Sequence, residues 1–206
     1  MKKDVTKMMI GAERLMAKTT NPRHLAILSN YRRHAMLEVS GRFDEIFDSS
    51  MTVEEPQYVT YTPTGCQILD GVAEVKRVFY GQLMEHGASV MILEDEAIAV
   101  DDWGFASEYM SNDYINATVA RLRGFTVDDD AATYLHRHRV VMTWRYSDDC
   151  RLIGENVSME MGGTIEKLAP EDVVTVAEAH ERLAPLIGAP PPRYDASGQP
   201  VAQGAA

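Results

Sequence analysis

The chain has 206 residues, which suits one compact domain, because chains usually divide only beyond roughly 250 residues. Its 31 acidic and 20 basic side chains give a formal net charge of −11, which repels phosphate backbones and anionic lipid surfaces and argues against nucleic-acid and membrane partners. Two cysteines are too few for a disulfide scaffold, and charged residues interrupt the apolar positions near the N-terminus. We therefore expect a cytoplasmic protein with free thiols.

The first quarter of the chain has helical spacing. Residues 1–20 predict a short amphipathic helical arm. A stronger helix is expected after Asn21, whose side chain can cap free backbone N–H groups, with Pro22 at its first position. Its apolar stripe contains Leu25, Leu28, Tyr31 and Ala35. A shorter helix is expected over residues 42–47.

Two further helices are predicted later in the chain. Over residues 71–86 apolar side chains recur at helical spacing, and Gly87 is placed to end the helix. Residues 166–188 predict a C-terminal helix. The tail, residues 189–206, is rich in Pro, Gly and Ala, so we expect it to be flexible or draped over the surface.

The remaining segments read as strands. They are expected near residues 51–63, 88–94, 96–101, 103–115, 133–147 and 150–161. The polar excursion over 116–132 has no regular pattern. Helices followed by a run of strands predict an α+β fold, with helices covering one face of a curved antiparallel sheet and a pocket at its wide mouth. We assign residues 21–165 to this domain.

The stretch from Ser49 to Leu83 resembles the signature of the NTF2-like superfamily, also called SnoaL-like. In that signature a strand ending in an acidic-Pro pair leads to a G-x-x-x-[IV] helix carrying an F-Y pair. The resemblance covers residues 22–161 and implies a cone-shaped barrel. It further implies chemistry without a cofactor on small, mostly apolar ligands. We expect a homodimer or homotrimer.

Within the superfamily the local likeness is to the ketosteroid isomerases, whose strand reads V-E-D-P. Here the tetrapeptide is Val53-Glu54-Glu55-Pro56. The likeness implies that Glu55 is the catalytic base and that Tyr31 stabilises an oxyanion. A carboxylate inside an apolar cone has a raised pKa, which suits a base. The alternatives are a solvated strand carboxylate for Glu55 and a satisfied core tyrosine for Tyr31.

The strand over 133–147 alternates strictly, and its more apolar even face should line the cone. This face carries His138, which we predict to be a third catalytic residue because histidine titrates nearest neutrality. The isomerase's protonated aspartate would fall near Met142, which cannot donate a hydrogen bond, so steroid isomerisation is not expected. Two histidines at i and i+2 with Glu55 are a weak metal signal, and no metal is predicted.

Aromatic and polar side chains supply candidates for binding the substrate. They are His34, Tyr58, Tyr61, Trp103, Met142 and Trp144. Because the register of a strand is not fixed by one sequence, Glu108 or Glu155 could replace Glu55 as the pocket carboxylate.

These residues predict a lyase or isomerase that needs no cofactor and moves a proton on a hydroxylated or carbonyl-bearing aromatic or polycyclic molecule. A retro-aldol cleavage of a lignin-derived diarylpropane belongs to this class. Two alternatives remain open, because the fold alone does not choose a function. One is a non-catalytic module for ligand binding or assembly, and the other is the small subunit of a ring-hydroxylating dioxygenase.

Overall fold

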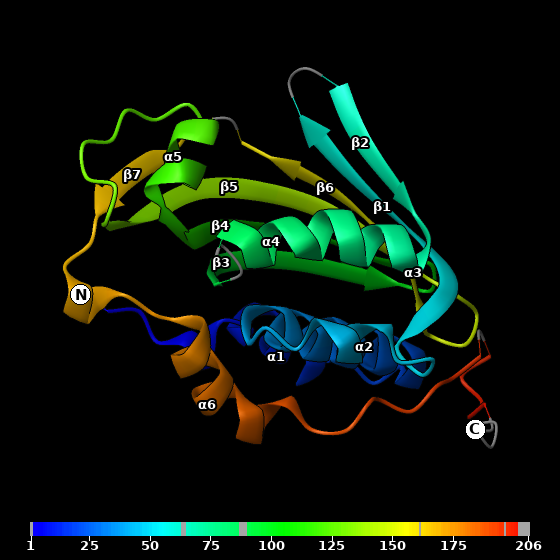
Figure 1. The fold of residues 1–206 in the computed structure, drawn as a ribbon. Coiled ribbons are helices and arrows are strands. Elements are labelled where there is room, and N and C mark those ends of the chain that lie inside the picture. The colour runs from blue at the N-terminus through cyan, green and yellow to red at the C-terminus, as the bar shows by residue number, and fades with distance from the viewer. Residues whose placement is uncertain (1, 63–64, 87–89, 161, 196, 202–206) are drawn as a thin grey trace.

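The computed structural model describes residues 2–62, 65–86, 90–160, 162–195 and 197–201 (Figure 1). The expected helix end at Gly87, the start of the strand predicted from residue 88, and residues 202–206 of the tail lie outside these ranges. The predicted α+β class is confirmed, because a curved sheet lies on one side of the molecule and most helices lie on the other (Figure 1). In the described part of the chain, no helix has the length and apolar character needed to cross a membrane.

The described strands form one curved sheet in the order β2-β1-β6-β5-β4-β3, with β7 beside β5. Neighbouring strands pair in antiparallel fashion except β1 and β6, which are parallel. The sheet is therefore open, with β2 and β3 at its ends. The strands are β1 (Thr52–Thr62), β2 (Gly65–Asp70), β3 (Met91–Asp101), β4 (Gly104–Asn116), β5 (Thr133–Tyr146), β6 (Leu152–Met159) and β7 (Thr164–Lys167).

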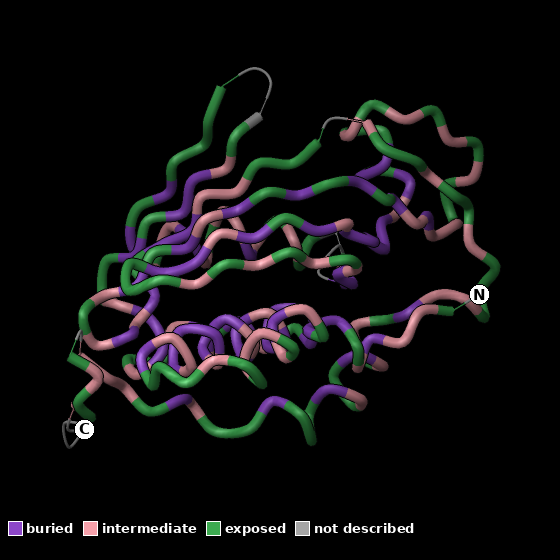
Figure 2. Tube along the Cα trace, turned by 180° about the vertical axis from the view of Figure 1, so that it is seen from behind, coloured by how far each residue is buried: buried purple, intermediate pink, exposed green. Residues whose placement is uncertain are grey.

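The longest helix, α2 (Pro22–Val39), packs against the sheet and carries more buried side chains than any other helix of the described chain (Figure 2). It begins as predicted, since Asn21 Oδ1 accepts hydrogen bonds from the backbone N–H groups of Arg23 and His24. The other helical segments are η1 (Val5–Lys7), α1 (Ile10–Met16), η2 (Phe43–Phe47), α3 (Gly71–Glu74), η3 (Val75–Tyr80), α4 (Gly81–His86), α5 (Ala117–Leu122), η4 (Pro170–Asp172) and α6 (Val176–Ile187).

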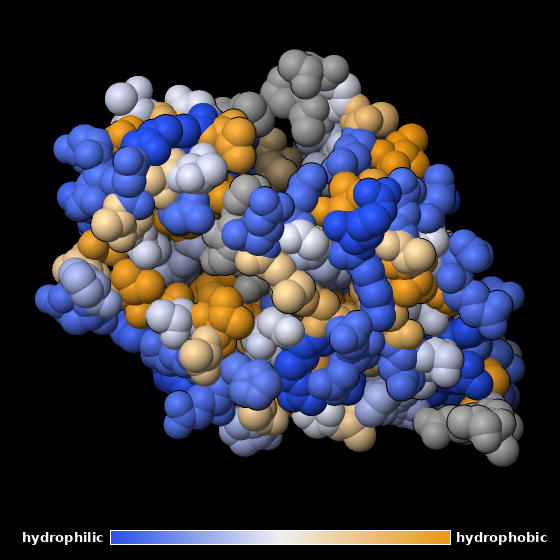
Figure 3. Space-filling view, in the orientation of Figure 1, coloured by the Kyte–Doolittle hydropathy of each residue, from blue (hydrophilic) through white to orange (hydrophobic). Residues whose placement is uncertain are grey.

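The N-terminal arm is part of the main core. Val5, Met8, Met9 and Ala12 are all buried there. Figure 1 shows α6 lying beneath α1 and α2, on the side away from the sheet. On the face seen in Figure 3, hydrophilic side chains predominate and apolar side chains form patches between them, as a charged, globular chain requires.

The structure departs from the predicted elements in three places. The strands expected at 88–94 and 96–101 form one strand, β3, whose register shifts between Glu94 and Ala97, where Asp95 has φ of 54°. Strands β2 and β7 were not predicted, and β7 takes up the start of the helix expected over 166–188, so that α6 begins only at Val176. The excursion over 116–132 contains α5, which packs with Val127 and other apolar neighbours into a small core of its own.

Buried Arg23 ties the first turn of α2 to several turns of the chain. Its guanidinium donates hydrogen bonds to the backbone carbonyl oxygens of Asp102 (3.0 Å from Nε), Ser147 (3.0 Å) and Asp148 (2.6 Å). It also donates to the carbonyl of Tyr194 at 3.3 Å, so this part of the tail lies against the domain. Arg23 therefore satisfies carbonyl groups that would otherwise be buried without a donor.

Candidate functional site

A cavity of about 160 Å³ lies between α2 and the inner face of the sheet. Its walls are mostly apolar and aromatic, and they come from α2, from η3 and α4, and from β1 and β3–β6. The predicted internal pocket is therefore confirmed. The polar and charged side chains that line it are Tyr31, Glu38, Thr60, Tyr109, Ser111, Asp113, Arg123, His138, Trp144 and Glu155.

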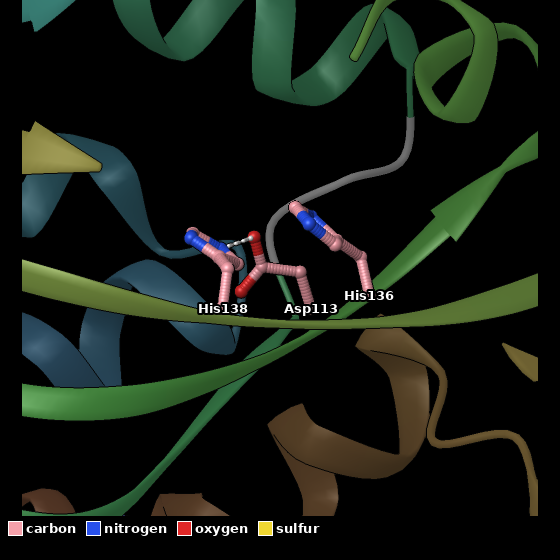
Figure 4. Close-up of side chains that lie close together, drawn as sticks. All are labelled: Asp113, His136 and His138. Atoms are coloured by element: carbon pink, nitrogen blue, oxygen red, sulfur yellow. Dashed lines mark hydrogen bonds and ion pairs between the residues drawn. The ribbon is translucent and has the colours of Figure 1, made fainter. Parts of the chain in front are cut away.

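At one end of the cavity, Asp113 on β4 holds His138 on β5 (Figure 4). His138 Nε2 lies 2.9 Å from Asp113 Oδ2. The other carboxylate oxygen, Oδ1, accepts a hydrogen bond from the hydroxyl of Ser111. Arg123, which follows α5, donates from Nη1 to Asp113 Oδ2 at 2.6 Å. The carboxyl group is thus surrounded by three donors.

These donors fix the protonation of the pair. Burial alone raises the pKa of Asp113, but the hydrogen bond from His138 and the charge of Arg123 lower that pKa far below its ordinary value. The ionised carboxylate accepts the Nε2–H of His138, which leaves a lone pair on Nδ1. Figure 4 shows the second ring nitrogen of His138 directed away from Asp113. Buried Nδ1 has no hydrogen-bond partner among the described residues.

Asp113, His136 and His138 also have the make-up of a metal site, since one ligand atom from each lies within 4.8 Å of the others. However, Arg123 Nη1 donates to His136 Nδ1 at 2.7 Å as well as to Asp113. The opposite nitrogen of His136 donates to the Gly162 carbonyl at 2.6 Å. A guanidinium therefore already supplies the positive charge where a cation would bind.

At the other end of the cavity, Glu155 on β6 lies beside Glu38 and His34 of α2. His34 Nε2 is 3.3 Å from Glu155 Oε1 and 3.1 Å from the Tyr80 hydroxyl. That hydroxyl donates to Glu38 Oε2 at 3.3 Å. Because the Tyr80 hydroxyl donates its hydrogen bond to Glu38, the Tyr80 oxygen accepts a hydrogen bond from His34 Nε2. His34 Nε2 also lies 3.5 Å from Glu38 Oε2, and His34 Nδ1 is buried without a partner among the described residues.

No Lys or Arg lies beside Glu155 to hold it ionised. Within the described ranges its one ion-pair contact is His34. Burial, and then the negative charge of Glu38, raise the pKa of Glu155 well above its ordinary value. Of the three candidates for the pocket carboxylate, Glu155 is the one that lines the cavity, and its raised pKa favours the protonated form.

The prediction that Glu55 lies inside the cone is wrong. Its side chain is exposed, and a Cβ added to Gly71 would lie 2.7 Å from its Oε2, outside the cavity. The reason is an irregularity in β1, whose register against β6 shifts between Thr52 and Gln57. Glu108 is also exposed, and it forms an ion pair with Arg139 on the outer face of the sheet.

Tyr31 lines the cavity as expected, but its hydroxyl is already engaged. It donates to Glu96 Oε1 at 2.7 Å, and Ser107 donates to the same oxygen at 2.9 Å. Burial, and then the Glu96 charge, raise the pKa of Tyr31 well above its ordinary value. The phenol is thus held as a wall of the cavity, 5.1 Å from the ring of Trp144.

The predicted substrate-binding residues divide into three groups. Met142 and Trp144 line the cavity, as the alternation of β5 predicts. His34 and Tyr58 are buried behind its wall. Tyr61 is 48% exposed and Trp103 is 45% exposed, so the prediction that these two line the pocket is wrong. Tyr61 alternates with inward-facing Thr60, and Trp103 belongs to the turn between β3 and β4.

Sequence reasoning missed Asp113, Arg123, Glu38 and Glu96. Ser111 and Asp113 have the same alternation as His136 and His138 on the strand that pairs with them, and this was the available signal for Asp113. No sequence signal pointed to Arg123, because it lies in the polar excursion over residues 116–132, which has no regular pattern.

No protein-family model and no curated protein matches the chain. Solved structures are similar to the chain at low sequence identity. The chain is similar to an NTF2-like superfamily protein from Salmonella enterica, with 15% identity over 69% of this chain and 91% of that one and a TM-score of 0.40.

Two other solved structures match over comparable lengths. A candidate isomerase of the SnoaL-like family from Agrobacterium tumefaciens has 14% identity over 67% of this chain and 97% of that one, with a TM-score of 0.39. A phenazine biosynthesis-related protein from Pseudomonas aeruginosa has 11% identity over 73% and 96%, with a TM-score of 0.46. At these identities the likeness concerns the fold alone.

Proposed function

We propose that this chain is an enzyme that moves a proton on a small, mostly apolar molecule bound in the cavity, without a cofactor, in an isomerase, cyclase or lyase reaction. One observation carries the proposal. His138 is held by the ionised carboxylate of Asp113 at 2.9 Å, while its other ring nitrogen is buried, unpaired among the described residues and part of a side chain that lines the cavity. A histidine held in this way is a general base.

The proposed reaction begins with the transfer of a substrate proton to His138 Nδ1. The electron pair of the broken C–H bond moves to a neighbouring carbonyl oxygen, which becomes an enolate. In a retro-aldol cleavage the proton comes instead from a hydroxyl group: the O–H electron pair forms a new carbonyl, the carbon–carbon bond breaks, and its electron pair becomes the enolate of the neighbouring carbonyl group. Asp113 is a positioning residue that stabilises the imidazolium, and the guanidinium of Arg123 stabilises the negative oxygen. His138 then returns the proton to a different atom.

The cavity supports an aromatic substrate. An apolar cavity of about 150 Å³ accommodates benzene, so a cavity of about 160 Å³ holds one aromatic ring without any movement of its walls. A second ring, as in a polycyclic or diarylpropane substrate, requires the walls to move or the ligand to extend beyond them. We propose a hydroxylated or carbonyl-bearing aromatic compound as the substrate class.

The test measures deuterium exchange at the benzylic positions of 2-indanone in D2O by NMR. The wild-type chain should accelerate exchange, and His138→Gln should lower the rate at least about 100-fold. Asp113→Asn should lower it while leaving the ketone bound. Glu55→Gln should exchange as wild type, because Glu55 is exposed. A wild-type chain that binds 2-indanone but exchanges it no faster than buffer does would be a binding module.

We further propose that the enzyme acts as a homodimer or homotrimer, which light scattering on the purified chain measures directly.

A further inference from the structure

The Glu155 end of the cavity has no part in the proton transfer proposed for His138. Glu155 pairs in register with Trp144 on β5, six residues along that strand from His138. Both ends nevertheless line the same cavity. A bound molecule therefore meets the Glu155 end with a different part of its structure from the part that meets His138.

Two hydrogen-bond donors are available at the Glu155 end. The first is the acid proton of Glu155, because no Lys or Arg in the described part of the chain compensates a negative charge on this buried side chain. The second is the indole N–H of Trp144, a buried donor on a cavity-lining residue that has no partner among the described residues. A buried donor without an acceptor costs about 1–3 kcal/mol, which a suitable ligand would recover.

The charge at this end of the cavity determines which kind of hydrogen-bond acceptor a ligand can place there. The Glu38 carboxylate lines the cavity next to Glu155 and would repel a ligand carboxylate. An uncharged carbonyl, phenol or ether oxygen has two lone pairs and carries no charge to desolvate, so it can accept from both donors. Burial of Glu155, which raises its pKa, is consistent with a group that stays a donor at neutral pH.

We propose that Glu155 and Trp144 form a subsite that binds an uncharged oxygen acceptor on an aromatic ligand. The inference rests on the proposed function, because it names the part of the substrate that is held away from His138. Its test measures binding alone, so either conclusion can fail without the other.

The test compares the dissociation constants of acetophenone, benzoate and benzylamine, which share one ring and differ in charge. Wild type should bind acetophenone at least about 10-fold more tightly than the two ions. Trp144→Phe keeps an aromatic ring but removes one donor, and it should weaken acetophenone binding about 5-fold. Glu155→Gln should stay within about 3-fold of wild type, because the carboxamide also donates, whereas Glu155→Leu should weaken binding about 10-fold.

Glu108→Gln, on the outer face of the sheet, is the matched control and should bind all three probes as wild type does. Far-UV circular dichroism establishes that each variant is folded. The inference is overturned if wild type does not bind acetophenone, if Trp144→Phe binds it unchanged, or if Glu155→Gln is as weak as Glu155→Leu. Tighter binding of benzylamine than of acetophenone would also overturn it, because a cation would then be the ligand of an ionised Glu155.

Discussion

Replacing Glu155 with Gln should make the protein more stable, and the gain should grow with pH. In the unfolded chain this glutamate ionises near its ordinary pKa of 4.5. In the folded protein burial, and then the Glu38 charge, raise the pKa, so the side chain keeps its proton. The stability that protonated Glu155 contributes to the folded protein is fully present below about pH 4.5, and it is lost as pH rises toward the folded-state pKa. Gln has no proton to lose and avoids this penalty.

The size of the effect follows from proton linkage. While the folded protein binds one proton more than the unfolded chain, its stability falls by about 1.4 kcal/mol for each pH unit. Over the pH range in which the folded protein keeps this proton, the free energy of unfolding of Glu155→Gln should therefore gain up to about 1.4 kcal/mol on wild type for each pH unit. The side chains that face Glu155 are His34, Glu38, Tyr58, Tyr80, Trp144 and Tyr146.

Urea unfolding followed by tryptophan fluorescence at pH 5, 6, 7 and 8 measures this difference. Glu55→Gln, which changes an exposed glutamate of β1, should show a difference from wild type that is flat across the series. A difference between Glu155→Gln and wild type that does not change with pH would mean that Glu155 is ionised in the folded protein, and the reasoning about both the acid and its subsite would be refuted.

Two further predictions concern stability. Asp113→Asn should lower the free energy of unfolding by about 3 kcal/mol at pH 7, because it leaves Arg123 without its buried carboxylate. This cost should shrink below about pH 4, because the pKa of Asp113 is depressed in the folded protein and the stability that the carboxylate contributes is lost as pH falls. An equal cost at pH 3 and pH 7 would contradict this. Arg23→Met should lower the free energy of unfolding by about 3–5 kcal/mol, because buried carbonyl groups lose their hydrogen-bond donor. Urea unfolding measures this, with Arg77→Met as the control because Arg77 is largely exposed. Equal values for the two variants would show that the Arg23 hydrogen bonds add no stability.

Local sequence signals predicted the scaffold of the site. The cap at Asn21 and the apolar stripe of the following helix placed Tyr31 on the inner face of α2. The alternation of β5 placed Met142 and Trp144 on the inner face of the sheet. These signals are reliable because helical and strand periods act over a few residues and do not depend on the rest of the fold.

Other features of the site depend on contacts that one sequence does not specify. Glu55 was misplaced because an irregularity in β1 changes which face a side chain occupies, and one residue of slippage is enough to do so. Asp113 meets His138 through the pairing of two strands 25 positions apart. The proton on Glu155 arises from burial beside Glu38, a residue of a distant helix.

Arg123 reaches the cavity from a segment that is not part of the sheet. It follows α5, whose apolar side chains pack into a small core with Val127 and Tyr134, while its guanidinium binds Asp113. Residues 117–132 are therefore the natural place for a randomised library or a graft from a relative. Changes there would alter which molecules the protein accepts, and the strands and long helix that hold the histidine would stay as they are.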